Sequence, residues 1–231
     1  MTDNSKDEFI EITRIKEEFI ANASHELKTP IASVRLAAES ALTSLERDDG
    51  MTKSFLEQIL RDSDRMNELI SDLLDLSAME SSDVFMEAFD LHDVIANEIS
   101  YLSKQNKKRI SYKKKNVEIN ANFDDISLAV KNLIKNALKY SPPEENILIQ
   151  VEENDKSVRC SFQDFGSGIS KPDQEKIFER FYRVDKGRSR KVGGTGLGLA
   201  IVKHALDRNN AVIEFVSELD YGSTFTIVFE K

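Results

Sequence analysis

The sequence predicts an α+β protein in two parts, an N-terminal antiparallel helical hairpin followed by an α/β sandwich with a mixed sheet. Apolar residues recur at helical spacing from about Glu8 to Leu45 and again from Thr52 to Met79. After the polar segment E-S-S-D at 80–83, short β-rich stretches mix with helical ones. The chain has 231 residues, 40% of them hydrophobic, which is enough for two cores. We therefore place the two domains at residues 1–80 and 84–231.

The hairpin is expected to turn at E-R-D-D-G-M-T, residues 46–52, where Gly50 suits a helix C-cap. Each helix carries an apolar stripe. The stripes comprise Phe19, Ile20, Ala23, Leu27, Ile31, Val34, Ala38, Ala41 and Leu45 on the first helix, and Phe55, Ile59, Met66, Ile70 and Leu73 on the second. Two facing helices cover only part of such broad stripes. We therefore expect a homodimer in which two hairpins form a four-helix bundle.

The stretch A-S-H-E-L-K-T-P-I at 23–31 contains one of only three histidines. At about 100° per residue, His25 lies about 165° from the apolar stripe and about 40° from Thr29. The imidazole is therefore expected to face water on the same side as Thr29. Helical geometry alone fits either a solvated surface residue or a reactive nucleophile. His92 and His204 are expected to be structural or solvated.

The second part is predicted to contain both strands and helices that do not alternate strictly, which favours a mixed sheet. Strands are expected at 111–119, 147–152, 157–165, 212–216 and 224–229, and helices at 91–106, 124–140 and 197–208. Cys160, in the alternating stretch V-R-C-S-F, is expected to fill the core. The basic residues from Lys107 to Lys115 are expected to face solvent along a strand edge.

Charge and composition exclude several classes of protein. A net charge of −9 argues against a nucleic-acid-binding surface, which is normally basic. No run approaches the roughly 18 apolar residues that span a bilayer, so membrane attachment is expected only through a segment upstream of this sequence. A single cysteine allows no intrachain disulfide and fits a reducing, cytoplasmic location.

Four stretches of the second part carry polar chemistry. In N-L-I-K-N-A-L-K-Y-S, residues 132–141, Asn132, Asn136 and Lys139 share one helix arc, where an amide oxygen suits Mg²⁺ and the ammonium suits phosphates. In D-F-G-S-G-I, residues 164–169, a carboxylate at a strand end can accept a hydrogen bond from an exocyclic amine. Each stretch alone also fits an ordinary role, as a polar helix face or a tight turn.

The other two stretches are rich in basic residues or in glycine. F-E-R-F-Y-R-V-D-K-G-R-S-R-K-V, residues 178–192, holds five basic residues after its second phenylalanine that could close over phosphates: Arg183, Lys186, Arg188, Arg190 and Lys191. G-G-T-G-L-G-L, residues 193–199, leads into a helix and offers backbone N–H groups to an anion. It matches neither a P-loop nor a strand-first Rossmann fingerprint.

Taken in order, H-E-L-K-T-P, N-L-I-K-N-A-L-K-Y, D-F-G-S-G, F-E-R-F-Y-R and G-G-T-G-L-G-L resemble the signature boxes of the two-component sensor histidine kinases. The resemblance extends from about residue 10 to residue 230 and includes the closing G-S-T-F-T-I at 222–227. It implies a dimerisation and phosphotransfer hairpin followed by a Bergerat-type ATP-binding domain. It also implies ATP and Mg²⁺ as cofactors and the receiver domain of a response regulator as a partner.

The resemblance implies a role for each matching residue. His25 is the expected phosphoacceptor, Glu26 its acid/base partner, and Thr29 the residue that orients water when the regulator is dephosphorylated. Asn136 is the expected Mg²⁺ ligand, with Asn132 nearby. The nucleotide is expected to contact Lys139, Tyr140, Asp164, Gly166, Gly168, Arg183, Gly194, Thr195, Gly196, Leu197 and Gly198, with Asp164 reading the adenine amine. Autophosphorylation of His25 and transfer to a regulator aspartate would follow.

Two positions depart from the family pattern. D-R-N-N-A at 207–211 replaces a common His-Gly-Gly turn, although Asn tolerates a left-handed φ. Phe165 stands where a small or polar residue is usual and could alter the wall of the adenine pocket. Two alternatives remain open: an ATP-hydrolysing conformational machine of the gyrase or Hsp90 kind, whose hairpin only dimerises, and a nucleotide-binding scaffold without phosphoryl transfer.

Overall fold

The computed structural model describes residues 3–184 and 194–231, with side chains for residues 13, 14 and 17 onward in those ranges. The chain forms two compact units: residues 1–73 with 193–195, and residues 74–192 with 196–231. The predicted order of a helical hairpin followed by an α/β unit is confirmed. None of the helices in the described ranges is long and apolar enough to cross a membrane.

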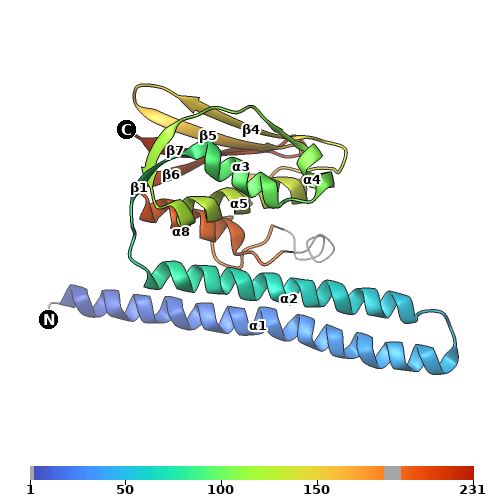
Figure 1. The fold of residues 1–231 in the computed structure, drawn as a ribbon. Helices are drawn as coiled ribbons and strands as arrows, with labels where there is room; N and C mark the ends of the chain where they lie inside the picture. The colour runs from blue at the N-terminus through green and yellow to red at the C-terminus, as the bar shows by residue number, and fades with distance from the viewer. Residues whose placement is uncertain (1–2, 185–193) are drawn as a thin grey trace. The chain divides into compact units, whose positions relative to one another are not determined.

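The hairpin consists of α1 (Asp3–Arg47) and α2 (Thr52–Ser81), which run antiparallel (Figure 1). The turn lies where the sequence predicts it. Asp48 and Gly50 adopt left-handed φ values of 52° and 74°. The Asp49 carboxylate accepts hydrogen bonds from the Met51 N–H, at 3.0 Å, and from the Ser44 hydroxyl. α1 continues through Pro30 without a break.

The two helices of the hairpin bury apolar side chains and share a partly buried polar contact. Ala37, Ala41 and Leu69 are buried, and Ser33 Oγ donates to Asp62 Oδ2 at 2.6 Å. Many large apolar side chains stay exposed in the single chain: Ile20, Ile31, Leu36, Leu42, Leu45, Leu56, Leu60 and Ile70. Three of these, Ile20, Ile31 and Leu45, belong to the predicted stripe of the first helix. One hairpin therefore does not cover its own apolar surface.

The second unit contains two sheets. β1 (Glu87–Asp90) pairs antiparallel with β3 (Glu118–Ala121). The larger sheet has the order β2-β4-β5-β7-β6, formed by β2 (Ile110–Tyr112), β4 (Ile147–Glu153), β5 (Ser157–Asp164), β7 (Gly222–Glu230) and β6 (Ala211–Glu218). β2 is parallel to β4 and the other pairs are antiparallel, so the predicted mixed sheet is confirmed.

Three helices, α3 (Leu91–Tyr101), α5 (Phe123–Tyr140) and α8 (Gly198–Arg208), lie on one side of this sheet (Figure 1). Alternate residues of β5, including Val158, Cys160 and Phe162, are buried beneath them, while their neighbours remain partly exposed. The α5 face toward the core carries Ile126, Val130, Leu133, Ile134 and Ala137. Cys160 is fully buried, as predicted, and burial raises the pKa of its thiol.

Several predicted boundaries were wrong. The expected strand 111–119 is two strands, β2 and β3. They are separated because Val117 N–H donates to the Asp90 carboxylate and the Val117 carbonyl accepts from Leu91 N–H. The expected helix 91–106 is α3 followed by the short α4 (Lys104–Lys108), which Ser103 caps. β1 was not predicted. A further short helix, α6 (Lys171–Gln174), follows β5.

The turn that replaces the family's glycine pair has a left-handed residue at Asn210, with φ of 51°. Asparagine can occupy this region because its short polar side chain bonds locally. The preceding residue, Asn209, is buried and donates to Ala205 O at 2.7 Å, which closes the C-terminus of α8. The expectation that the turn survives without glycine is therefore confirmed.

Candidate active site

A cavity of about 320 Å³ opens in the second unit beside the C-terminal half of α5. Its walls come from α5, the end of β5 with the following loop, residues 177–184, α8 and β7. Six of the residues singled out in the sequence line it: Asn136, Lys139, Tyr140, Asp164, Gly168 and Arg183. Its volume is within the range of small-molecule pockets in proteins.

The end of α5 carries three of these residues, and a guanidinium group holds it. Arg109 donates from Nη1 to Leu138 O (3.2 Å), from Nη2 to Ser141 O (3.2 Å) and Pro142 O (2.8 Å), and from Nε to Glu145 O (3.2 Å). These carbonyls lie at or just beyond the helix terminus, where intrahelical partners run out. The prediction that the whole basic run faces solvent was therefore wrong for Arg109, while Lys107 and Lys108 are exposed.

Positive charge gathers on one side of the cavity. Lys139 Nζ lies 5.1 Å from the centre of the Tyr140 ring, which is a cation–π contact. Burial raises the pKa of the Tyr140 hydroxyl, and the positive charge of Arg183 opposes that shift. Lys139 and Arg183 thus make this wall of the cavity suitable for an anionic ligand.

Asp164 supplies a buried carboxylate to the same cavity. Only 6% of its surface is exposed, and Oδ1 accepts a hydrogen bond from Gly166 N–H at 2.9 Å. Burial raises the pKa of this carboxyl, although hydrogen bonds from Gly166 and Ser223 act in the other direction. An acceptor in such a dry setting discriminates strongly for a ligand N–H group, because leaving it unpaired is costly.

The loop after Asp164 requires glycine at two positions. A Cβ atom on Gly166 would lie 2.4 Å from the carbonyl oxygen of Tyr140, and Gly168 has φ of +64°. Phe165 is partly exposed, and its N–H donates to Ser141 Oγ at 3.0 Å. It is absent from the cavity lining among the described residues, so the expected change in the pocket wall was not found.

Seven other predicted nucleotide contacts do not line the cavity among the described residues: Asn132, Gly166, Gly194, Thr195, Gly196, Leu197 and Gly198. Asn132 is buried, donates to Leu128 O at 2.9 Å, and approaches Gly198, where a Cβ would lie 3.0 Å from its Oδ1. Its amide therefore serves the packing of α5 against α8.

The glycine-rich stretch is divided between the two units. Gly194 and Thr195 belong to the first unit, in which Thr195 Oγ1 donates to Asp72 Oδ2 at 2.5 Å. Gly196 belongs to the second unit, and its carbonyl accepts from Phe181 N–H at 2.9 Å. Leu197 is fully buried at the start of α8. The predicted basic residues Lys186, Arg188, Arg190 and Lys191 lie outside the described part of the chain.

Most of the apolar lining of the cavity was not predicted from the sequence. The residues concerned are Ile169, Ile177, Val184, Leu199 and Phe225, together with Ser167, Tyr182 and Ser223. Ser223 and Phe225 lie on β7, whose register with β5 sets Ser223 opposite Asp164. The G-S-T-F-T-I stretch at 222–227 was the available signal for these two. The tyrosine hydroxyl of Tyr182 donates to Asp173 Oδ1 at 2.6 Å, which holds residues 182–184.

The histidine of the first unit is exposed on α1, and so is Thr29, as predicted. Thr29 Oγ1 donates to the carbonyl oxygen of His25 at 3.3 Å. Glu26 is partly buried and accepts a hydrogen bond from Arg65 Nη2 of α2 at 3.0 Å. This ion pair could not be predicted from local patterns, because 39 residues separate the partners.

No cluster of three or more histidine, cysteine, aspartate or glutamate side chains suited to a metal occurs in the described ranges. Asn136 places a neutral amide in the cavity wall. This donor fits Mg²⁺, which commonly keeps several waters and takes other ligands from a substrate's phosphates.

Two family models match the chain. Residues 15–82 match the His Kinase A (phospho-acceptor) domain, and residues 121–231 match the histidine kinase-, DNA gyrase B- and HSP90-like ATPase. The two matches follow the order of the hairpin and the α/β unit.

The sequence is also similar to curated relatives. It is 35% identical over 237 residues to the sensor-like histidine kinase SenX3 of Mycolicibacterium smegmatis, covering 97% of this chain and 59% of the relative. It is 36% identical over 227 residues to the phosphate regulon sensor protein PhoR of Pseudomonas aeruginosa, covering 95% and 51%. The chain thus spans between half and three fifths of the length of these relatives.

Two solved structures share the fold. The histidine kinase AdeS of Acinetobacter baumannii gives a TM-score of 0.66 at 22% identity, covering 89% of this chain and 97% of that one. The histidine kinase ThkA, solved in complex with the response regulator protein TrrA, gives a TM-score of 0.74 at 19% identity, covering 96% and 63%.

Proposed function

Because the chain belongs to the two-component sensor histidine kinases, we propose that it uses ATP to phosphorylate His25 and passes the phosphoryl group to an aspartate of a response regulator. The observation that carries the proposal is an exposed imidazole next to a carboxylate in one unit, and in the other a cavity with a buried acceptor and a cationic wall. The ThkA neighbour, solved with a response regulator, supports the kind of partner.

In the cavity, we propose that each part of ATP contacts a different wall. Asp164 would accept a hydrogen bond from the adenine amine, with Ile169, Ile177 and Phe225 against the base. Lys139 and Arg183 would contact the phosphates, and Tyr140 would lie against the nucleotide. We propose that the glycines at 194, 196 and 198 line the triphosphate.

Asn136 would hold Mg²⁺ through its amide oxygen, with Asn132 behind it on the same helix. When bound, the ion would neutralise charge on the phosphates. The protein would position the reactants and stabilise their charge, because phosphoryl transfer depends mainly on positioning and electrostatics.

The phosphorylation step conserves charge and atoms. A nitrogen of the neutral His25 imidazole forms a P–N bond to the γ-phosphorus while the bond from that phosphorus to the bridging oxygen of ADP breaks. Glu26 accepts the imidazole proton. The phosphoryl group then passes from nitrogen to the carboxylate oxygen of a receiver aspartate.

The test is incubation of the full chain with γ-labelled ATP. We expect an acid-labile, base-stable label on the protein that His25→Gln abolishes and the control His92→Gln retains. Release of free phosphate without protein label would instead indicate a gyrase-like or Hsp90-like ATPase. Nucleotide binding with neither product would indicate a scaffold.

Further proposals concern the domain boundaries, the dimer, the dephosphorylation of the regulator and the location of the protein. We propose that the phosphotransfer domain spans 1–80 and the ATP-binding domain 84–231, and that two hairpins dimerise through the exposed apolar residues of α1 and α2. We propose that Thr29 supports dephosphorylation of the regulator by orienting water. We also propose that this part of the kinase works in the cytoplasm.

A further inference from the structure

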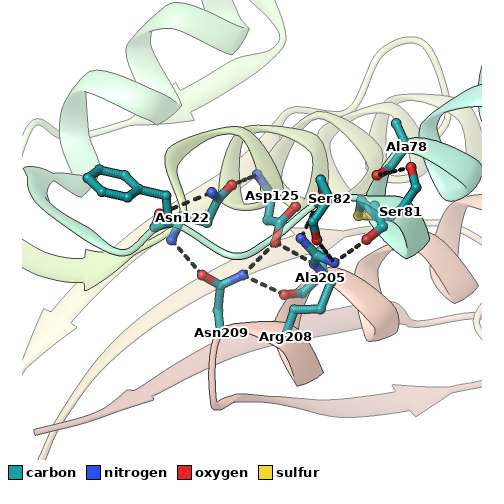
Figure 2. Close-up of polar contacts among 10 residues, drawn as sticks. Ala78, Ser81, Ser82, Asn122, Asp125, Ala205, Arg208 and Asn209 are labelled. Atoms are coloured by element: carbon teal, nitrogen blue, oxygen red, sulfur yellow. Dashed lines mark hydrogen bonds and ion pairs between the residues drawn. The ribbon is translucent and has the colours of Figure 1, made fainter.

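One arginine of the second unit joins three segments that are distant in sequence. Arg208, the last residue of α8, contacts the start of α5 and the end of α2, which is included in this unit from Leu74 onward (Figure 2). Its Nε donates to Asp125 Oδ2 at 2.9 Å, and the two side chains expose only 14% and 6% of their surface. Buried charges of this kind are normally paired, and here both are.

Asp125 also has a second partner beside the arginine. Asn209 Nδ2 donates to Asp125 Oδ2 at 3.0 Å, and Asn209 Oδ1 accepts from the Asn122 N–H at 2.5 Å. Asn122 in turn caps α5, because its Oδ1 accepts from Asp125 N–H at 3.0 Å. Figure 2 shows these side chains as one connected network. It is held within the α/β unit and does not depend on α2.

The remaining nitrogens of Arg208 point to a different segment. Nη1 donates to the carbonyls of Met79 and Ser82, the latter at 3.1 Å, and Nη2 donates to Ser82 Oγ at 3.1 Å. Met79 lies in the last turn of α2, and Ser82 begins the connector, residues 82–86, that leads to β1. A cation at a helix C-terminus satisfies carbonyls that lack intrahelical partners.

Other contacts fasten the same end of α2. Leu76 and Met79 expose only 1% and 5% of their surface within the chain. Arg180 Nη2 donates to Glu80 Oε1 at 2.7 Å, and Arg180 lies between Ile177 and Tyr182, which both line the cavity. The last two turns of α2 are thus attached to the α/β unit before the polar connector begins.

We propose that Arg208 is a positioning residue for the phosphorylation of His25, which it serves by fastening the end of α2 and the start of the connector to the ATP-binding domain. The inference rests on the proposed kinase function. With the fastening in place, the effective tether between the domains is shorter than the whole connector. A shorter tether raises the effective concentration of one reacting site at the other.

The geometry of the guanidinium offers a variant that separates the two tasks of Arg208. Arg208→Lys keeps a cation for Asp125 but has no fork to reach Met79 and Ser82 at the same time. The matched control is Ser81→Ala, since within the described part of the chain Ser81 Oγ donates to Ser77 O and Ala78 O of its own helix. Ser82→Ala, which removes one of the three contacts from Arg208 to Met79 and Ser82, should give a smaller effect in the same direction.

The experiment measures three quantities on the full chain: kcat and KM for ATP in the phosphorylation of His25, and hydrogen exchange of the amides of residues 79–82. For Arg208→Lys we expect kcat to fall about fivefold, KM to stay within about twofold of the wild-type value, and exchange to rise about tenfold. Ser81→Ala should match the wild type in all three.

Two results would overturn the inference. One is a wild-type kcat and wild-type exchange in Arg208→Lys. The other is a rise in KM with kcat unchanged, which would make Arg208 a support of the nucleotide cavity. If Arg208→Lys lowers the melting temperature strongly, Ser82→Ala decides, because it leaves the buried pair intact; a wild-type kcat and exchange there would count against the inference. Failure of the wild type to label His25 would instead contradict the proposed function.

Discussion

Arg65 Nη2 of α2 lies 3.0 Å from Glu26 Oε2 of α1, and both side chains are partly buried. The carboxylate next to His25 is therefore held from the opposite helix of the same hairpin. An ion pair across the hairpin limits the rotamers of Glu26 and directs one of its oxygens to Arg65. The other oxygen, Oε1, is the one we expect to accept the imidazole proton.

Glu26→Gln tests that role without dismantling the hairpin. A glutamine oxygen can still accept the Arg65 hydrogen bond, so we expect the free energy of unfolding to change by about 1 kcal/mol or less. The loss of the proton acceptor should lower kcat for His25 phosphorylation about 100-fold. Labelling rates and thermal melts would measure the two effects. Glu39→Gln, which breaks an exposed pair with Arg35 on the same helix, is the control. Equal rates in both variants would remove Glu26 from the mechanism.

Arg109→Met tests the cap at the end of α5. The substitution leaves four carbonyl groups without the donors that Arg109 supplies. We expect the free energy of unfolding to fall by about 3 kcal/mol, and KM for ATP to rise because Lys139 and Tyr140 lie in the last turn. Chemical denaturation and nucleotide titration would check both. Lys108→Met, at an exposed neighbouring position, should change neither; an unchanged KM in Arg109→Met would show that the cap does not support the cavity.

Arg109 also shows why some of the site could not be predicted. The same stretch contains five lysines of like charge, Lys107, Lys108 and residues 113–115, and only the fold brings the carbonyls of residues 138–145 to Arg109. Likewise, only the fold brings Arg65 to Glu26. Periodicity identifies which face of a helix is polar, but it does not identify partners that are tens of residues apart.

By contrast, local patterns predicted much of the fold. The hairpin, its turn at Gly50, α5, α8 and four strands of the larger sheet appear within a few residues of their expected places. Each has a strong local signal: helical spacing, alternation or a left-handed turn. The failures at 91–106 and 111–119 occur where Ser103 and Asp90 make capping and bridging hydrogen bonds that interrupt an otherwise continuous pattern.

The buried carboxyl of Asp164 predicts a pH dependence of stability. Because burial raises its pKa in the folded state, the folded chain binds more protons than the unfolded chain between the two pKa values. This group therefore makes stability decline as pH rises through its folded pKa, and the full cost applies above it. Asp164→Asn removes the charge and keeps an acceptor for Gly166 N–H.

We therefore expect Asp164→Asn to be more stable than the wild type at pH 7, with the difference shrinking as the pH is lowered toward 4. Its affinity for ATP should fall at least about tenfold, because the amide no longer offers a charged acceptor to the adenine amine. Thermal melts across pH and nucleotide titration would measure this. Asp155→Asn, at an exposed turn, is the control. A stability difference that grows on acidification would contradict the assignment.

The uncovered apolar surface of the hairpin predicts self-association. Leu60 is 64% exposed on α2, and a charge there would have to be desolvated in a four-helix bundle. We expect the wild type to sediment as a dimer at micromolar concentration and Leu60→Glu to sediment as a monomer. Leu219→Glu, at a 54% exposed position of the second unit, should remain dimeric. A monomeric wild type would refute the dimer.

A substitution at Thr29 is expected to separate phosphorylation of His25 from dephosphorylation of the regulator. Its hydroxyl donates to the His25 carbonyl at 3.3 Å, four residues earlier, so the side chain lies one turn beyond the histidine and on the same face. Removal of this hydroxyl leaves the imidazole, Glu26 and the nucleotide cavity unchanged. Thr29→Ala should therefore phosphorylate His25 at a rate within about twofold of the wild type. Its rate of regulator dephosphorylation should fall about 10-fold or more, because no side chain would orient the attacking water. The measurement follows label on His25 and then its loss from a phosphorylated regulator. Thr43→Ala, whose hydroxyl makes the same kind of bond to Glu39 O at 3.1 Å, controls for the loss of a helix-surface threonine. If Thr29→Ala slows both reactions equally, the threonine supports the helix around His25 and has no separate role in dephosphorylation.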